Sequence, residues 1–163
     1  MKKIGTINEH NFSREKINKL PIRKKVRGLI YKNKNTLVCV EEDGYGIKHI
    51  LKLPGGSVEK NESNIKAIKR EILEETGYEI GNVKCIGFIE NIRKEHNFHM
   101  TYYVAKTKGK QKKIKLTAEE LVVGTKPIEI NTETALKRIK AEYNKVKNDS
   151  SLRDIMVFNE LNK

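Results

Sequence analysis

Alternating hydrophobic and polar residues mark several short stretches of the chain, which is the pattern of half-buried β-strands. The clearest stretch is 98–106, where every second residue from Phe98 onward is apolar over most of its length. Two further stretches, 26–32 and 36–41, are separated by the turn-prone sequence KNKN, which predicts a hairpin. The remaining predicted strands are residues 48–53, 83–90 and 127–130.

A hydrophobic period of 3.6 residues predicts three helices, at 62–77, 132–144 and 151–161. Ser150 or Ser151 is the expected N-cap of the third helix, with Asp154 in its first turn. The residues expected to face the core are Ile65, Ile68, Ile72, Leu73 and Thr76 on the first helix, and Ala135, Leu136, Ile139 and Tyr143 on the second.

A chain of 163 residues is long enough to bury one substantial core. The first residues are polar and weakly patterned, so we expect an N-terminal arm or edge element at 1–22 and a single domain at 23–163. No apolar run approaches the length of a membrane span, so no membrane partner is expected. The N-terminus lacks the apolar segment of an export signal, which favours a cytoplasmic protein.

The net charge of +13 makes polyanions such as nucleotides, polyphosphates or nucleic acid attractive partners. Lysine is spread over the whole chain, however, so a solvated surface is the favoured explanation for most of this charge. The basic run 23–27 leaves the same choice open, between a nucleic-acid patch and the protection of an edge strand by lysine. Cys39 and Cys85 lie in apolar stretches without ligand spacing and are expected to be small buried hydrophobic residues.

Three carboxylates, Glu71, Glu74 and Glu75, are crowded on the first predicted helix. Carboxylates at such spacing repel each other and weaken a helix unless a cation lies among them. Mg²⁺ is bound through carboxylate oxygens and substrate phosphates, and the preceding Gly55-Gly56 permits a loop that turns backbone carbonyls toward a cation. A surface helix with solvated glutamates is the alternative when the helix is considered alone.

The whole segment 56–78 resembles the signature of the Nudix hydrolases, G-x5-E-x7-R-E-U-x-E-E-x-G-U, in which U is a bulky apolar residue. At an average residue frequency of roughly 7%, seven fixed matches arise by chance on the order of once in 10⁸ windows. Tyr78 is a mild variation, because an aliphatic residue is usual there. The fixed positions are Gly56, Glu62, Arg70, Glu71, Glu74, Glu75 and Gly77.

The resemblance implies an α/β fold, an α/β/α sandwich around a mixed β-sheet, and divalent-metal-dependent hydrolysis of a nucleoside diphosphate linked to another group, X. It also implies a metal site of Gly55 (through its carbonyl), Glu71, Glu74 and Glu75, with Mg²⁺ or Mn²⁺ as the ion. Arg70 and Glu62 are expected to form a supporting ion pair.

A carboxylate is needed to take the proton from the attacking water. Glu71 or Glu75 is one candidate in such proteins, and an acidic residue from a later loop is another. Glu120, beside Glu119, is the natural candidate in that later loop, although the pair also suits the acidic first turn of a helix. Arg93 and Lys94 lie in a charged loop from which they could reach phosphate, or they form a solvated hairpin tip.

The sequence leaves the substrate open. Because marks of several other Nudix subgroups are absent, a nucleoside triphosphate or a related small nucleotide is favoured, as in MutT-like members. The 5′ end of RNA is the alternative suggested by the charge, and a non-catalytic nucleotide-binding regulator on the same scaffold is the third. A homodimer is compatible with the sequence.

Overall fold

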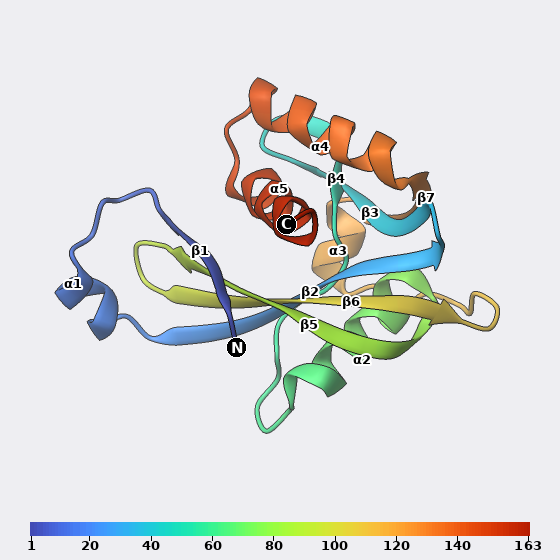
Figure 1. The fold of residues 1–163 in the computed structure, drawn as a ribbon, viewed down its shortest axis with the longest axis horizontal. Coiled ribbons are helices and arrows are strands. Elements are labelled where there is room, and N and C mark those ends of the chain that lie inside the picture. The colour runs from blue at the N-terminus through green and yellow to red at the C-terminus, as the bar shows by residue number, and fades with distance from the viewer.

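The centre of the molecule is a seven-stranded mixed sheet (Figure 1). The computed structural model describes all 163 residues. Along the sheet the strands follow the order β1-β5-β6-β2-β3-β4, with β7 also paired to β3. The pairs β1–β5 and β2–β6 are parallel and the others are antiparallel. The strands are β1 (Lys3–Asn8), β2 (Ile22–Asn33), β3 (Thr36–Gly44), β4 (Ile47–Lys52), β5 (Glu79–Ile92), β6 (Asn97–Lys108) and β7 (Lys126–Asn131).

Helices cover both faces of this sheet (Figure 1). The longer helices are α2 on one face, and α4 and α5, which pack against each other, on the opposite face. None of the five helices is long and apolar enough to cross a bilayer. The helices are α1 (Arg14–Lys19), α2 (Asn64–Thr76), α3 (Ala118–Val122), α4 (Thr132–Lys145) and α5 (Asp149–Leu161). The predicted α/β/α sandwich around a mixed sheet is therefore confirmed.

The alternation of side chains along the strands divides the core into two layers. On β2, Leu29 belongs to the cluster that α4 and α5 cover, whereas Val26 and Ile30 belong to the cluster beneath α2. All three side chains are fully buried. Because β2 is apolar on both faces here, it is an interior strand, and the predicted β2–β3 hairpin is present beside it.

This interior position shows that one interpretation of the basic run 23–27 was wrong. The run lies in the first half of β2, which pairs with β6 on one side. On its other side it is bonded to the backbone of residues 54–58, so it is not an edge that lysines need to protect. The outer strand beyond β5 is β1, which pairs with it in parallel.

Two details of the predicted helices are also corrected. Ile65 is 41% exposed, and the buried face of α2 instead includes Ala67 and the carboxyl-bearing Glu71 and Glu75. The face turned inward is thus rotated toward the carboxylates, which lie against the loop before the helix. The N-cap of α5 is Asn148, whose side chain accepts a hydrogen bond from the Ser151 backbone N–H, and Ser150 and Ser151 are buried in the first turn.

Candidate functional site

The loop 53–58 is held against β2 as if it were a short additional strand. Gly28 N–H donates to Pro54 O and Val26 N–H to Gly56 O, both at 2.9 Å. Gly55 has φ 134°, and a Cβ at this position would lie 2.2 Å from Val26 O. Only glycine fits so close to the strand. The sequence Gly55-Gly56 is therefore what allows the loop to follow β2 and then turn toward α2.

Helix α2 presents its glutamates to this loop because both of its ends are fixed. Ser63 caps the N-terminus by accepting from Lys66 N–H at 3.3 Å, and Gly77, with φ 73°, ends the helix in the left-handed conformation. In this register the Glu75 carboxylate accepts the Gly55 N–H at 2.6 Å. A Cβ on residue 56 would lie 2.5 Å from the Glu71 carboxyl group. The glycine pair thus forms a cradle that the two carboxylates fill.

Glu71 and Glu75 are buried, and burial makes the negative charge of their carboxylates energetically costly. Burial raises the pKa of Glu75 to about 7, although the nearby Arg27 and the Gly55 N–H act in the opposite direction. Burial also raises the pKa of the Glu71 carboxyl, again against the effect of an arginine, Arg70. A raised pKa means that the negative charge is costly in this environment without a further cation. The two carboxylates therefore suit a hard divalent ion.

Arg70 is the cation already present among the carboxylates. Its guanidinium donates to Glu62 through two hydrogen bonds of 2.9 Å, to Glu71 at 3.0 Å and to Glu74 at 3.1 Å. It also donates to the Ser57 carbonyl at 3.0 Å. The carboxylates, Glu62 above all and then Glu71 and Glu74, raise the pKa of Arg70. The predicted pairing of Arg70 with Glu62 is thus part of a larger network that joins α2 to the loop before it.

Several groups that could hold a metal lie on α2 and on the loop before it. They are the carboxylates of Glu71, Glu74 and Glu75 and the carbonyl of Gly55. In the structure no three His, Cys, Asp or Glu side chains converge on a single point, because Arg70 ties Glu71 and Glu74 together and Glu75 turns to the Gly55 N–H. The buried charges and the glycine cradle fit a divalent ion, which would have to draw these side chains inward.

A cleft of about 530 Å³ runs past the carboxylates. Lys25 and Arg27 of β2 line it together with the acidic face of α2, and Glu119 and Glu120 line it from α3. The backbone beside α3 is fastened to α2, since Lys115 N–H donates to Glu74 O at 2.8 Å. Acidic and basic side chains thus share one cleft, as a site for a metal-bound phosphate compound requires.

Glu120 lies in the acidic first turn of a helix and also lines the cleft. Thr117 caps α3, and its backbone N–H donates to the Glu120 carboxylate at 2.6 Å, which completes a capping box. The same side chain lies in the cleft, where its charge raises the pKa of Glu75. No cation is paired with Glu120, in contrast to Glu71 and Glu74.

Arg93 and Lys94 are placed away from the carboxylates. Arg93 pairs with Glu9 at 2.9 Å and with Asp149 at 2.8 Å, and it lines a separate cavity next to the cleft. Lys94 is exposed and lines neither space. The structure therefore brings together the predicted residues of α2 and α3, and keeps the Arg93 loop apart from them.

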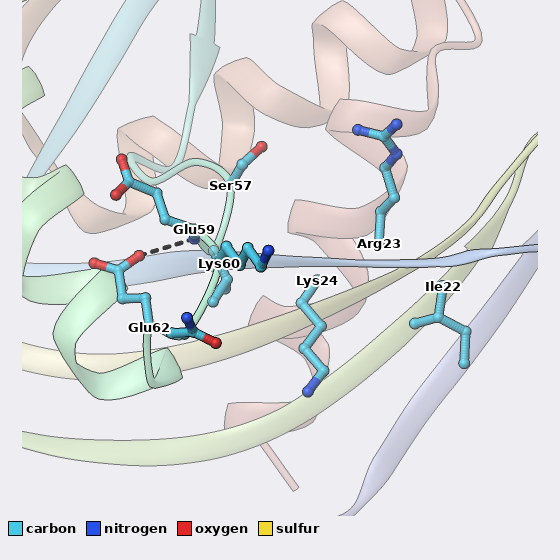
Figure 2. A pocket seen from close by; sticks show the side chains of 9 residues that line it. Ile22, Arg23, Lys24, Ser57, Glu59, Lys60 and Glu62 are labelled. Carbon is cyan, nitrogen blue, oxygen red and sulfur yellow. Dashed lines mark hydrogen bonds between the residues drawn. The ribbon is translucent and has the colours of Figure 1, made fainter.

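A shallow groove of about 570 Å³ adjoins the other end of the cleft. Figure 2 shows that Arg23 and Lys24 of β2 point to opposite sides of the strand there. The loop 57–62 forms the opposite wall, in which the Glu59 N–H donates to Glu62 at 3.0 Å (Figure 2). This groove contains the outer support of Arg70 rather than further metal-binding groups.

Sequence reasoning did not single out Lys25, Arg27 and Arg153, which line the cleft or the cavity next to it. The first two fall within the basic run of β2, where period-two alternation places them on the same face as Leu29. The alternation alone could therefore have predicted that Lys25 and Arg27 share one face of the sheet. Arg153 comes from α5, and no local pattern marks it.

Comparison with known proteins gives a consistent picture. A family model described as NUDIX domain matches residues 21–147. An 8-oxo-dGTP diphosphatase of Buchnera aphidicola subsp. Acyrthosiphon pisum (strain APS) is 36% identical over 59 residues. That match covers 36% of this chain and 48% of the relative, so the chain spans about half the length of the curated relative it matches.

Solved structures resemble the fold over a larger share of the chain. A NUDIX hydrolase from Nitrosomonas europaea has a TM-score of 0.64 at 20% identity, with 85% of this chain and 88% of that chain covered. The E. coli ORF135 protein has a TM-score of 0.56 at 17% identity, with coverages of 74% and 81%. A MutT NUDIX hydrolase from Burkholderia pseudomallei has a TM-score of 0.50 at 19% identity, with coverages of 57% and 73%. At these identities the likeness concerns the fold.

Proposed function

The chain belongs to the NUDIX domain family, whose enzymes are Nudix pyrophosphohydrolases, and from this premise we propose that it hydrolyses the diphosphate linkage of a nucleoside triphosphate or a related small nucleotide in a divalent-metal-dependent reaction. The observation that carries the proposal is the placement of buried Glu71 and Glu75 against the Gly55-Gly56 loop, in a cleft that also contains Lys25 and Arg27.

A divalent ion bound by Glu71, Glu74, Glu75 and the Gly55 carbonyl would neutralise the phosphates and lower the pKa of a bound water. The protein's own groups perform the remaining work. Arg70 donates to Glu71 and Glu74 and so keeps both side chains on the cleft side of α2, from which a bound ion would draw them inward.

On the opposite side of the cleft, Lys25 and Arg27 can neutralise the phosphate oxygens that do not contact the metal. We assign proton removal from the attacking water to Glu120. Its carboxylate lies in the same cleft as Glu75, has no cationic partner, and is held by the capping hydrogen bond from Thr117. Glu71 and Glu75 would then bind the metal ion and would not remove the proton from the water.

The choice of a nucleoside triphosphate is supported by the relative whose name is 8-oxo-dGTP diphosphatase. The aligned 59 residues are a short stretch, so the substrate has to be measured. Products released from a panel of nucleoside triphosphates, oxidised nucleotides, nucleoside diphosphate sugars and 5′-triphosphorylated RNA would be quantified with Mg²⁺ and with Mn²⁺.

We expect turnover of at least one small nucleotide, and loss of that turnover in Glu75→Gln. Cleavage of RNA alone would replace the small-nucleotide proposal with the RNA 5′ end. Absence of turnover on every compound would favour a binding or regulatory protein. An undiminished rate in Glu75→Gln would refute the metal-site assignment.

A further inference from the structure

Three cationic side chains near the cleft, Lys25, Arg27 and Arg153, form no salt bridge with a carboxylate. Arg27 donates to the Leu53 carbonyl at 2.9 Å, and Lys25 has no ion-pair partner. Arg153 is 8% exposed, and its Nε has no hydrogen-bond partner. Arg153 is buried and Lys25 and Arg27 are half-buried, with Lys25 Nζ lying 5.3 Å from the centre of the Phe98 ring. Withdrawing charges from water without an opposite charge is costly, so a protein that keeps these three groups together needs a reason to do so.

These cations also repel one another. The pKa of Lys25 is lowered by burial first and then by the charges of Arg27, Arg153 and Arg23. The carboxylate among them, Asp154, is itself buried, accepts the Leu53 N–H at 3.1 Å, and has its pKa raised to about 6 by burial. Glu71 and Glu75 also interact with Arg27, but they line the carboxylate cleft and not the space next to Arg153. The positive charge is therefore offset only partly, and the cluster attracts a further anion.

The cluster surrounds a cavity of about 210 Å³ next to the carboxylate cleft. Four cations line this cavity (Lys25, Arg27, Arg93 and Arg153), and none of its lining residues is acidic. Arg93 is already paired with Glu9 and Asp149, so the three cations without a carboxylate partner are the ones available to a ligand. Lys25 and Arg27 line both spaces, so a single ligand can extend from the glutamates into the cavity.

We propose that this cavity is an anion subsite, which binds a phosphate group that the substrate carries in addition to the diphosphate hydrolysed beside the glutamates. Preferred substrates therefore contain at least three phosphates. Phosphate oxygens match the fork of an arginine and form charge-assisted hydrogen bonds, whereas a neutral sugar or base would leave the cations unpaired. The inference rests on the proposed hydrolysis for the diphosphate, but the subsite itself can be tested without turnover.

Binding of inorganic pyrophosphate to the metal-free protein would be measured by calorimetry. Without metal the glutamates repel this ligand, so its binding reports on the cations. We expect Arg153→Gln to weaken binding at least tenfold, as the loss of a charge-assisted hydrogen bond predicts. Lys24→Gln is the matched control, because it removes the same charge from an exposed side chain that points to the other side of β2 (Figure 2). We expect less than a twofold change there.

An equal loss in Arg153→Gln and Lys24→Gln would overturn the proposal, because binding would then reflect only the overall positive charge. Lys25→Gln provides a second variant from another element, with the same expected loss, should Arg153→Gln fail to fold. Thermal unfolding of each variant would establish that it is folded.

Two matched substrate pairs, dGDP with dGTP and NAD with NADP, locate the extra phosphate. We expect the wild type to favour the more phosphorylated member of at least one pair by tenfold or more in kcat/KM, and Arg153→Gln to reduce that preference to within threefold. A preference in the first pair places the group on the phosphate chain, and a preference in the second places it on the ribose.

The two proposals fail in distinguishable ways. Equal use of both members of each pair by an active enzyme would refute the subsite and leave the hydrolysis intact. Failure to hydrolyse any nucleotide, together with the expected loss of pyrophosphate binding in Arg153→Gln, would refute the hydrolysis and leave the subsite intact.

Discussion

Replacing the buried Glu75 by glutamine should stabilise the metal-free protein at alkaline pH. The same change should abolish activity when the divalent metal is present. Glu75 is 4% exposed, and burial raises its pKa from the ordinary 4.5 to about 7. Between these values the native state binds more protons than the unfolded state, so stability falls as the pH rises through about 7. A pKa difference of about 2.5, at about 1.4 kcal/mol for each pH unit, corresponds to about 3 kcal/mol.

The glutamine side chain keeps an oxygen for the Gly55 N–H and has no charge to bury. At pH 8 we therefore expect Glu75→Gln to be more stable than the wild type by up to about 3 kcal/mol, or roughly 6–12 °C in Tm for a chain of this size. The advantage should shrink to below about 0.5 kcal/mol at pH 4.5, where the native carboxyl is protonated and the unfolded one is half-protonated. Urea unfolding in the presence of a chelator, at pH 4.5 and pH 8, measures both values.

Glu74→Gln is the matched control, because the Glu74 side chain is 37% exposed and already bonded to Arg70. We expect no stabilisation from this change. Adding Mg²⁺ should stabilise the wild type at pH 8 and have a much smaller effect on Glu75→Gln, because binding to the native state raises its stability. Equal stability of Glu75→Gln and the wild type at pH 8 without metal would show that the carboxylate is not destabilised by burial.

Three further substitutions test other parts of the site. Arg70→Ala should cost about 3 kcal/mol in urea unfolding, because it leaves buried Glu71 without its cation; a cost below about 1 kcal/mol would contradict the structural role. Asp154→Ala should cost about 1–3 kcal/mol, since the Leu53 N–H loses its acceptor, and Asp154→Asn should restore most of it. Glu120→Gln keeps the capping box, so its stability should stay within about 0.5 kcal/mol of the wild type while kcat falls at least a hundredfold; an unchanged kcat would remove Glu120 as the base.

Local patterns in the sequence were sufficient for most of the fold. The alternation at 98–106 and the KNKN turn predicted strands and a hairpin that are present in the sheet. The helix at 64–76 was also predicted, because its apolar period and closing Gly77 are local signals. Ile68, Ile72 and Thr76 of its predicted buried face are buried, whereas Ile65 is exposed because the buried face extends over Glu71 and Glu75, which were expected only at its border.

The grouping of Lys25, Arg27 and Arg153 around one cavity depends on tertiary contacts, which no local sequence pattern predicts. Arg153 reaches Lys25 and Arg27 only because α5 crosses the same face of the sheet as the first half of β2. The N-cap of α5 was similarly missed because serine and asparagine cap equally well, and the choice of Asn148 depends on where the chain leaves α4. Tertiary packing decides both features.

The attachment of the segment before α3 to α2 has a mechanical consequence. The N–H groups of Lys112 and Lys115 donate to the carbonyls of Gly77 and Glu74, so this segment is suspended from the same helix that bears the metal-binding glutamates. The other end of α3 is bonded to the sheet, because the Asp43 N–H of β3 donates to Val123 O at 2.8 Å. The wall that bears Glu119 and Glu120 therefore bridges α2 and β3. The distance between Glu120 and the glutamates of α2 is thus set by how α2 packs on the sheet, and a shift of α2 relative to the sheet would change it.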